Sequence, residues 1–385
     1  MSKLRILLHI GMPKAGSTAL QHAFRALAPQ LRAAGVLYPD VASSQVSHKF
    51  LTFALCEDHE LPGHFRNLHG GSAERRARWL REDWARIRSQ VARHRPHTLL
   101  LSTEHLFDGF TRGRGAALRD LLAELSDDIE VIAYVRRPSA YYLSLTQQML
   151  KGSAAMSPPA PVGYREVLAQ CEQVFTRLSV VAFEREQLSG GDIVPDFFER
   201  FLPDLKALAV SRKGARNETF SAESMAIVQD YRQLHHGGRN RQKPLDVKRL
   251  LTGVRLAELA SGWSVRPRLL PEVEHYLDHA SIDLLWLRER HGLVFSGVDY
   301  AVVGEQPAHY AAARRVSDIC MVDVERRQAL QLFLLSMLLK TRMPLPFSVL
   351  AWLHGPGTGW LVGLARRVMG LSVAGPDGRR SVARS

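Results

Sequence analysis

The segment that most constrains the fold is residues 7–18, LLHIGMPKAGST, in which an apolar run leads into a loop bounded by two glycines. The apolar run predicts a buried strand, and the residues after Gly16 predict the start of a helix. Such a loop turns backbone N–H groups toward one point, which is the geometry of a phosphate site. Gly11 and Gly16 have the glycine spacing of the nucleotide-binding pattern G-x-x-x-x-G-K-[ST], but the lysine comes earlier, as Lys14, and Ser17 follows the glycine. The displaced lysine argues against the metal-dependent design of that pattern.

A second motif, chemically independent of the first, occupies residues 129–144, IEVIAYVRRPSAYYLS. It predicts an apolar strand that ends in two arginines and is followed by a helix. Arg136 and Ser144 lie eight residues apart. An arginine offers a planar fork of donors to a phosphate, and a hydroxyl with a helix N-terminus can complete the cage. The alternative is a strand end with solvated arginines.

Together the two motifs resemble the sulfotransferases that use 3′-phosphoadenosine-5′-phosphosulfate, whose 5′-phosphosulfate loop follows the pattern K-[AT]-G-[ST]-[ST]. The resemblance implies that Arg136 and Ser144 bind the 3′-phosphate of this donor and that no metal is needed. It implies a 5′-phosphosulfate site made by Lys14, Ala15, Gly16, Ser17 and Thr18. Arg137 and Ala140 occupy variable positions of the second motif, and the family's usual aspartate is absent, which leaves donor binding intact.

Further segments resemble landmarks of bacterial carbohydrate sulfotransferases, up to about Val298. They are GVLYP (35–39), LSTEHL (101–106), FEREQL (183–188), GGDIV (190–194) and NETFS (217–221). The resemblance implies a sugar of a glycan or glycolipid as the acceptor. Arg212 and Lys213, within SRKG (211–214), resemble a second clamp on the 3′-phosphate, and a solvated basic turn is an equal alternative.

Three residues are candidates for the base that removes the acceptor proton. Glu104 follows the expected strand at 98–103, so that its carboxylate lies at the sheet edge that faces the donor. His48 resembles the histidine that follows GVLYP in bacterial relatives, and His105 resembles the catalytic histidine of cytosolic sulfotransferases. We rank Glu104 first, His48 second and His105 third.

Composition agrees with an anionic ligand. The chain has 51 Lys and Arg against 38 Asp and Glu, a formal charge of +13. This balance suits a phosphorylated nucleotide, a polyanionic glycan or a lipid surface. Nucleic acid is not expected, because the sequence has no zinc-finger spacing, RNA-binding signature or basic-region heptad. Cys56, Cys171 and Cys320 are widely spaced and predict buried thiols rather than a disulfide framework or zinc site. With strand residues close to the amino terminus in place of a signal peptide, we expect a cytoplasmic protein.

The chain as a whole predicts an α/β fold. Apolar strands at 98–103, 129–135 and 178–183 alternate with helices, which indicates a mostly parallel, P-loop-like sheet covered on both faces. We expect one α/β domain over residues 1–300 and a helical, apolar and basic extension over 301–385. Its two apolar runs, 329–339 and 344–368, are too short to span a bilayer. They predict helices that pack on the main domain or a partner subunit, or an interfacial anchor on the inner face of the membrane.

The sequence therefore predicts a bacterial, cytoplasmic, metal-independent sulfotransferase. One alternative is a P-loop kinase for a small hydroxylated substrate, which needs magnesium and an acidic residue at a strand end, where residues 129–135 are followed by arginines instead. The other is a non-catalytic relative that binds a glycan or a membrane.

Overall fold

The computed structural model describes residues 4–57, 59, 61, 72–110, 115–209, 219–237, 243–304 and 310–340. The chain forms two compact units. Unit 1 comprises Met1–Ser144, Ala160–Lys213 and Glu274–His309, and unit 2 comprises Leu145–Pro159, Gly214–Val273 and Tyr310–Ser385. This division differs from the expected boundary near residue 300, because the segment between the second motif and residue 273 contributes to both units.

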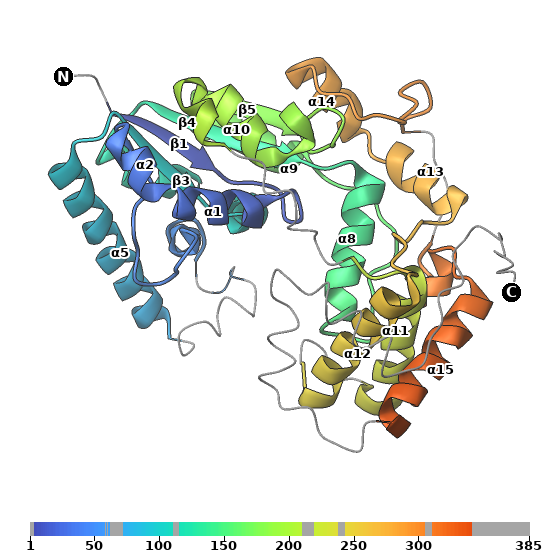
Figure 1. Ribbon diagram of the computed structural model, residues 1–385. Coiled ribbons are helices and arrows are strands. Elements are labelled where there is room, and N and C mark those ends of the chain that lie inside the picture. The colour runs from blue at the N-terminus through green and yellow to red at the C-terminus, as the bar shows by residue number, and fades with distance from the viewer. Residues whose placement is uncertain are drawn as a thin grey trace, which may run out of the picture. The chain divides into compact units, whose positions relative to one another are not determined.

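Unit 1 contains a five-stranded sheet, counted over the described residues, and all of its strands are parallel (Figure 1). In spatial order the strands are β2 (Val36–Leu37), β3 (Thr98–Ser102), β1 (Arg5–His9), β4 (Ile129–Val135) and β5 (Arg177–Ala182). The prediction of an α/β fold with a parallel sheet is confirmed. Because β1 lies between β3 and β4, the segments that follow these three strands emerge side by side at one edge.

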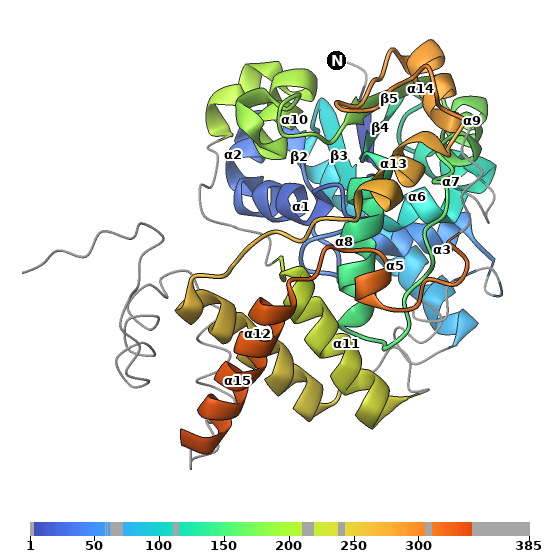
Figure 2. The ribbon, with the colours of Figure 1, turned by 90° about the vertical axis from the view of Figure 1, so that its right-hand side faces the viewer.

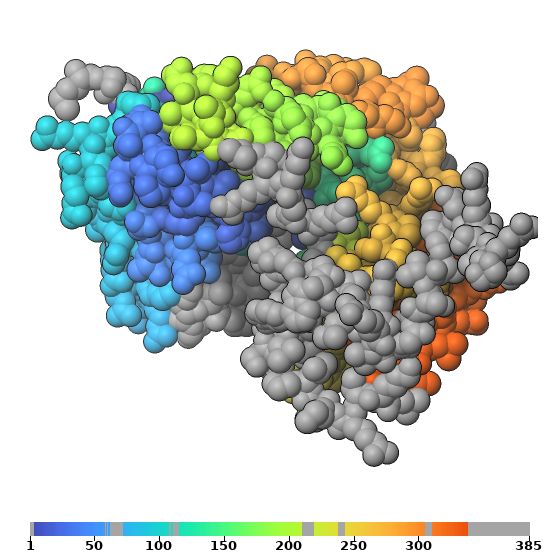
Figure 3. Space-filling view, viewed as in Figure 1, coloured from blue at the N-terminus to red at the C-terminus, as the bar shows by residue number. Residues whose placement is uncertain are grey.

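Helices cover both faces of the sheet. Figure 2 shows α1 (Ser17–Ala26), α2 (Ala28–Ala33) and α10 (Ile193–Phe201) on one side of the sheet. On the other side lie α3 (Thr52–Leu55), α5 (Ala73–His94), α6 (His105–Phe110), α7 (Gly115–Ala123) and α9 (Arg165–Val174). The chain runs from the central strand β1 to the edge strand β2, and then reverses direction across the sheet to β5 at the opposite edge. Because crossovers between parallel strands are right-handed, this reversal places the connecting helices on opposite faces. In the space-filling view, α1 and α10 form neighbouring parts of the surface (Figure 3).

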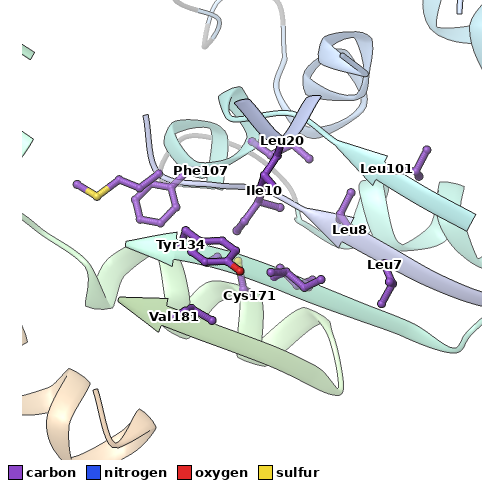
Figure 4. Close-up of a cluster of buried hydrophobic side chains, with 14 of the residues drawn as sticks. Leu7, Leu8, Ile10, Leu20, Leu101, Phe107, Tyr134, Cys171 and Val181 are labelled. Atoms are coloured by element: carbon purple, nitrogen blue, oxygen red, sulfur yellow. The ribbon is translucent and has the colours of Figure 1, made fainter. Parts of the chain in front are cut away.

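The core of unit 1 lies between the sheet and these helices. Strand β1 is buried on both faces, with Leu7 and Leu8 fully inaccessible to solvent. Figure 4 shows these side chains with Leu101 of β3, Val181 of β5 and Leu20 of α1 in one cluster. Burial of this kind contributes about 1.5–3 kcal/mol for each large apolar side chain, so the core holds β1 and the loop after it firmly in place.

The remaining elements of unit 1 follow the sheet strands. They are the 3₁₀ helices η1 (Lys49–Leu51), η3 (Ser189–Gly191) and η4 (Pro203–Leu208), and the helix α14 (Asp283–His291). Two helices are shared between the units: α8 (Pro138–Leu150) begins in unit 1, and α13 (Pro271–His279) ends in it.

Unit 2 is helical. It contains α11 (Ala222–His236), α12 (Leu245–Ser261), α15 (Val324–Lys340) and the 3₁₀ helix η5 (Val316–Asp318). Its three long helices contact one another. Ser221 caps α11 through a hydrogen bond from the Ser224 N–H to its hydroxyl, and the Ser221 N–H donates to the buried Glu258 carboxylate. The expected interfacial anchor at 344–368 lies outside the described residues. Among the residues that the structure describes, no helix is long and apolar enough to cross a membrane.

Candidate active site

The loop between β1 and α1 is held in a tight curve by three residues with positive φ. Gly11, Lys14 and Gly16 have φ values of 32°, 67° and 85°. Gly16 is the N-cap of α1, and its carbonyl accepts hydrogen bonds from the N–H groups of Ala19 and Leu20 at 2.9 and 3.3 Å. The first N–H groups of a helix have no intrahelical partner, so the start of α1 offers backbone donors and a positive dipole end to an anion.

The two glycines are needed for space as well as for backbone conformation. A β-carbon at residue 16 would lie 2.7 Å from Phe183 Cε2 and 2.8 Å from Ile193 Cδ1. A β-carbon at residue 11 would lie 2.5 Å from Ser17 Oγ and 2.7 Å from His9 Nε2. The loop therefore packs closely on its neighbours, and its inner surface at Gly11 faces two polar atoms.

Lys14 is a non-glycine residue in the left-handed region, a conformation that costs free energy and persists only where surrounding contacts fix it. One such contact is with the second motif. Arg136, directly after β4, donates from Nη1 to the Lys14 carbonyl over 2.9 Å. Its guanidinium carbon also lies 5.7 Å from the centre of the Phe183 ring. The structure thus brings together two motifs that are far apart in the sequence.

The neighbouring Arg137 has a different role. Its guanidinium forms ion pairs with Glu274 at 2.9 Å and with Asp278 at 3.4 Å, both on α13. Asp278 in turn accepts hydrogen bonds from the backbone N–H and the hydroxyl of Ser139 at 2.9 and 2.8 Å, which caps the start of α8. Burial raises the pKa of the Asp278 carboxyl, and the Arg137 charge opposes that rise. Arg137 therefore joins α8 to α13, and Arg136 is the arginine directed to the loop.

The other expected donor ligands lie on the loop, on α1 and on α8. Ser17 is buried at the first position of α1, Thr18 beside it is exposed, and Ala15 is buried within the loop. Ser144 is half-buried on α8, about 9 Å along the helix axis from Pro138 at a rise of 1.5 Å per residue. Arg212 and Lys213 lie outside the described residues.

The three candidates for the base lie in different environments. Glu104 and His105 follow β3 and are half-buried, at the sheet edge where the loop and Arg136 also emerge. The Glu104 carbonyl accepts the Phe107 N–H at 3.3 Å, and the His105 N–H donates to the Thr103 hydroxyl at 3.4 Å. These bonds start α6 and fix the backbone of both residues next to the strand end.

His48 is fully buried, in contrast to the exposed position that a base would need. Its Nδ1 accepts the Ser102 N–H at 3.0 Å, so its Nε2 carries the proton and donates to the Pro39 carbonyl at 3.2 Å. Burial lowers the pKa of His48 to about 4. Both ring nitrogens are therefore engaged with the backbone, and this geometry gives His48 a structural role between β3 and the segment after β2.

A polar cluster that the sequence motifs did not indicate lies beneath the loop. His9, the last residue of β1, is fully buried, and its Nδ1 lies 2.8 Å from the hydroxyl of Ser102, its register partner on β3. Gln21 of α1 donates to the same hydroxyl at 3.4 Å. The signal in the sequence was a histidine within an apolar strand, directly before the glycine loop, because a buried polar side chain needs partners.

Among the described residues, no group of three or more His, Cys, Asp or Glu side chains is placed to hold a metal ion. No model of a protein family matches the chain, and no curated protein matches it.

Proposed function

We propose that this chain is a sulfotransferase that moves sulfate from 3′-phosphoadenosine-5′-phosphosulfate to a hydroxyl of a carbohydrate or glycolipid. The observation that carries the proposal is the hydrogen bond from Arg136 to the Lys14 carbonyl. This contact supports the binding of one ligand with two phosphates, one of them held by the loop and the other by the arginine at the end of β4. A donor with phosphates at both its 5′ and 3′ positions has this distribution of charge.

In this proposal the loop binds the 5′-phosphosulfate. The first N–H groups of α1, the Ser17 and Thr18 hydroxyls and the Lys14 ammonium donate to its oxygens. Arg136 binds the 3′-phosphate through its planar guanidinium, and the Ser144 hydroxyl adds a second donor. Ion pairs with α13 hold Arg137 away from this task, which supports the choice of Arg136.

The proposed chemical step is an in-line displacement at sulfur. A bond forms between the acceptor oxygen and sulfur, while the bond between sulfur and the bridging phosphate oxygen breaks and adenosine 3′,5′-bisphosphate leaves. Negative charge develops on that bridging oxygen, and Lys14 stabilises it electrostatically. The acceptor proton passes to a base, for which we propose the Glu104 carboxylate, with His105 as the alternative at the same strand end.

A binding comparison tests the donor assignment. Thermal unfolding is recorded with adenosine 3′,5′-bisphosphate, with adenosine 5′-phosphate and with ATP plus magnesium. We expect the bisphosphate to give the largest upward shift, because binding to the folded state alone stabilises by RT ln(1 + [L]/Kd). A shift with ATP that depends on magnesium, together with none for the bisphosphate, would favour the kinase interpretation and overturn the proposal.

Turnover is tested separately, with the sulfate donor and a panel of hydroxylated acceptors that includes sugars, glycolipids and simple phenols. We expect sulfated product only with acceptors of the first two classes, and no dependence on added magnesium. Normal bisphosphate affinity without product from any acceptor would favour a non-catalytic binding protein.

A further inference from the structure

Two buried polar atoms beneath the loop have no hydrogen-bond partner among the described residues. They are His9 Nε2 and Ser17 Oγ, on side chains that are 0% and 1% exposed. Both face the inner surface of the loop at Gly11, where an added β-carbon would lie within 2.7 Å of each. Buried polar atoms in native proteins are nearly always paired, so this arrangement indicates that a partner is supplied when the loop is in use.

The hydrogen bonds around His9 favour one tautomer of its ring. The Gln21 amide donates to the Ser102 hydroxyl, which therefore acts as an acceptor in that contact. The Ser102 hydroxyl keeps its proton to donate, and His9 Nδ1 at 2.8 Å is its acceptor in the tautomer that carries the ring proton on Nε2. Burial lowers the pKa of His9 to about 3, so the ring is neutral near pH 7. In that tautomer the free end of the ring is an N–H donor beside Gly11 of the loop.

The ring is also held in orientation. It packs edge-on against Tyr134 and Phe197, with centroid distances of 6.1 and 6.3 Å. His9 and Ser102 are register partners on adjacent strands, so the contact at Nδ1 is built into the sheet. The Nε2–H group is thus fixed, whereas the Ser17 hydroxyl can rotate among staggered positions.

We propose that His9 is a positioning residue: when an anion occupies the loop, its Nε2–H donates to Ser17 Oγ and leaves the Ser17 hydroxyl proton directed at an anion oxygen. A hydroxyl can donate or accept, whereas a phosphate or sulfate oxygen only accepts. With its lone pair bonded to His9, Ser17 presents a donor to the ligand. The inference rests on the proposed function only in that the loop binds an anion.

A double-mutant cycle tests this coupling. His9→Gln keeps an amide N–H group near the position of Nε2, and His9→Asn, its matched control, keeps a partner for Ser102 but does not reach Ser17. The third variant is Ser17→Ala, which is combined with each. Binding is measured by calorimetry with two probes, adenosine 3′,5′-bisphosphate and inorganic pyrophosphate. The folded state of each variant is checked by thermal unfolding without ligand.

We expect His9→Asn and Ser17→Ala each to weaken binding about 10-fold, the equivalent of one hydrogen bond to a charged group, and His9→Gln to stay within about 3-fold of the original protein. Because His9 acts through Ser17, the double variant of His9→Asn and Ser17→Ala should bind as Ser17→Ala does. Independent losses that multiply in the double variant would overturn the inference, as would equal losses for the Asn and Gln variants.

The two probes separate this inference from the proposed function. Coupling seen with pyrophosphate, in a protein that does not bind the bisphosphate, would support the role of His9 and overturn the choice of donor. Bisphosphate binding without coupling between His9 and Ser17 would support the choice of donor and overturn the role of His9. If neither probe binds, both the choice of donor and the role of His9 are overturned.

If the His9 variants do not fold, ¹⁵N-histidine spectra of the original protein test the role of His9, with the His9 signal assigned through Ser102→Ala. A signal from the Nε2–H tautomer that shifts with pyrophosphate supports the inference, and an Nδ1–H tautomer or an unshifted signal overturns it.

Discussion

The adjacent arginines Arg136 and Arg137 provide a matched pair of substitutions with opposite expected effects. Arg136→Ala removes a guanidinium that donates to the Lys14 carbonyl of the loop and lies over the Phe183 ring. Arg137→Ala removes a guanidinium that pairs with Asp278, whose side chain is 3% exposed, and with the more exposed Glu274. We expect the first substitution to affect nucleotide binding and the second to affect stability.

The magnitudes follow from these contacts. The hydrogen bond to the Lys14 carbonyl contributes about 1 kcal/mol to stability and the contact with the Phe183 ring about 0.5–1 kcal/mol, so Arg136→Ala should cost about 1–2 kcal/mol. Charge-assisted bonds to a 3′-phosphate are stronger, and their loss should weaken binding of adenosine 3′,5′-bisphosphate by about 2–3 kcal/mol, roughly 30- to 150-fold. Arg137→Ala removes the cation beside the buried Asp278 carboxylate, which keeps its bonds from Ser139, and should lower the free energy of unfolding by about 2–3 kcal/mol.

The assay combines urea unfolding with calorimetric titration of adenosine 3′,5′-bisphosphate and adenosine 5′-phosphate for both variants. Adenosine 5′-phosphate lacks the 3′-phosphate, so its affinity should change little in Arg136→Ala. Equal losses for the two nucleotides would show that Arg136 does not recognise the 3′-phosphate. A selective loss of bisphosphate affinity in Arg137→Ala, with unchanged stability, would reverse the assignment of the two arginines.

Three further predictions concern the loop and the buried histidines. Lys14→Ala should reduce the turnover number of sulfate transfer about 100-fold with a smaller change in donor affinity. Normal turnover with a raised KM for the donor would show that Lys14 does not act in the chemical step. Gly11→Ala should abolish anion binding and cost about 1–3 kcal/mol of stability. Its control is Gly190→Ala, at φ 61° with no atom within 4 Å of the added methyl, which should cost about 1 kcal/mol and leave anion binding intact. Calorimetry measures the binding of both variants, and urea unfolding measures their stability. Because the pKa values of His9 and His48 are lowered in the folded state, the unfolded state binds more protons than the folded state below about pH 6.5. The free energy of unfolding should therefore fall on acidification, by about 2 kcal/mol for each histidine at pH 5. His48→Gln should remove its share of that pH dependence in urea unfolding, and an unchanged dependence would contradict the burial argument.

Local sequence patterns predicted β1, β3, β4 and β5 of unit 1, but not the two-residue strand β2. The apolar run at residues 129–135 is strand β4 with the same bounds, and those at 98–103 and 178–183 agree with β3 and β5 to within one residue. The helix expected after Gly16 begins at Ser17 and ends at Ala26, and α2 begins directly after Leu27, with Pro29 in its first turn. Strand alternation with helices then leaves the parallel sheet as the expected arrangement.

The sequence by itself determined that a glycine loop would open a helix after the first strand, and that arginines would follow another strand, since both depend on neighbouring residues. Tertiary structure alone decided which arginine reaches the loop, because the Glu274 and Asp278 partners of Arg137 are distant in the sequence. It also decided that His48 is enclosed by backbone groups and that His9 Nε2 and Ser17 Oγ both lie next to Gly11. Burial and hydrogen-bond partners arise from contacts between remote segments, and these contacts, not the residue type, set whether a histidine is exposed for catalysis or fixed within the core.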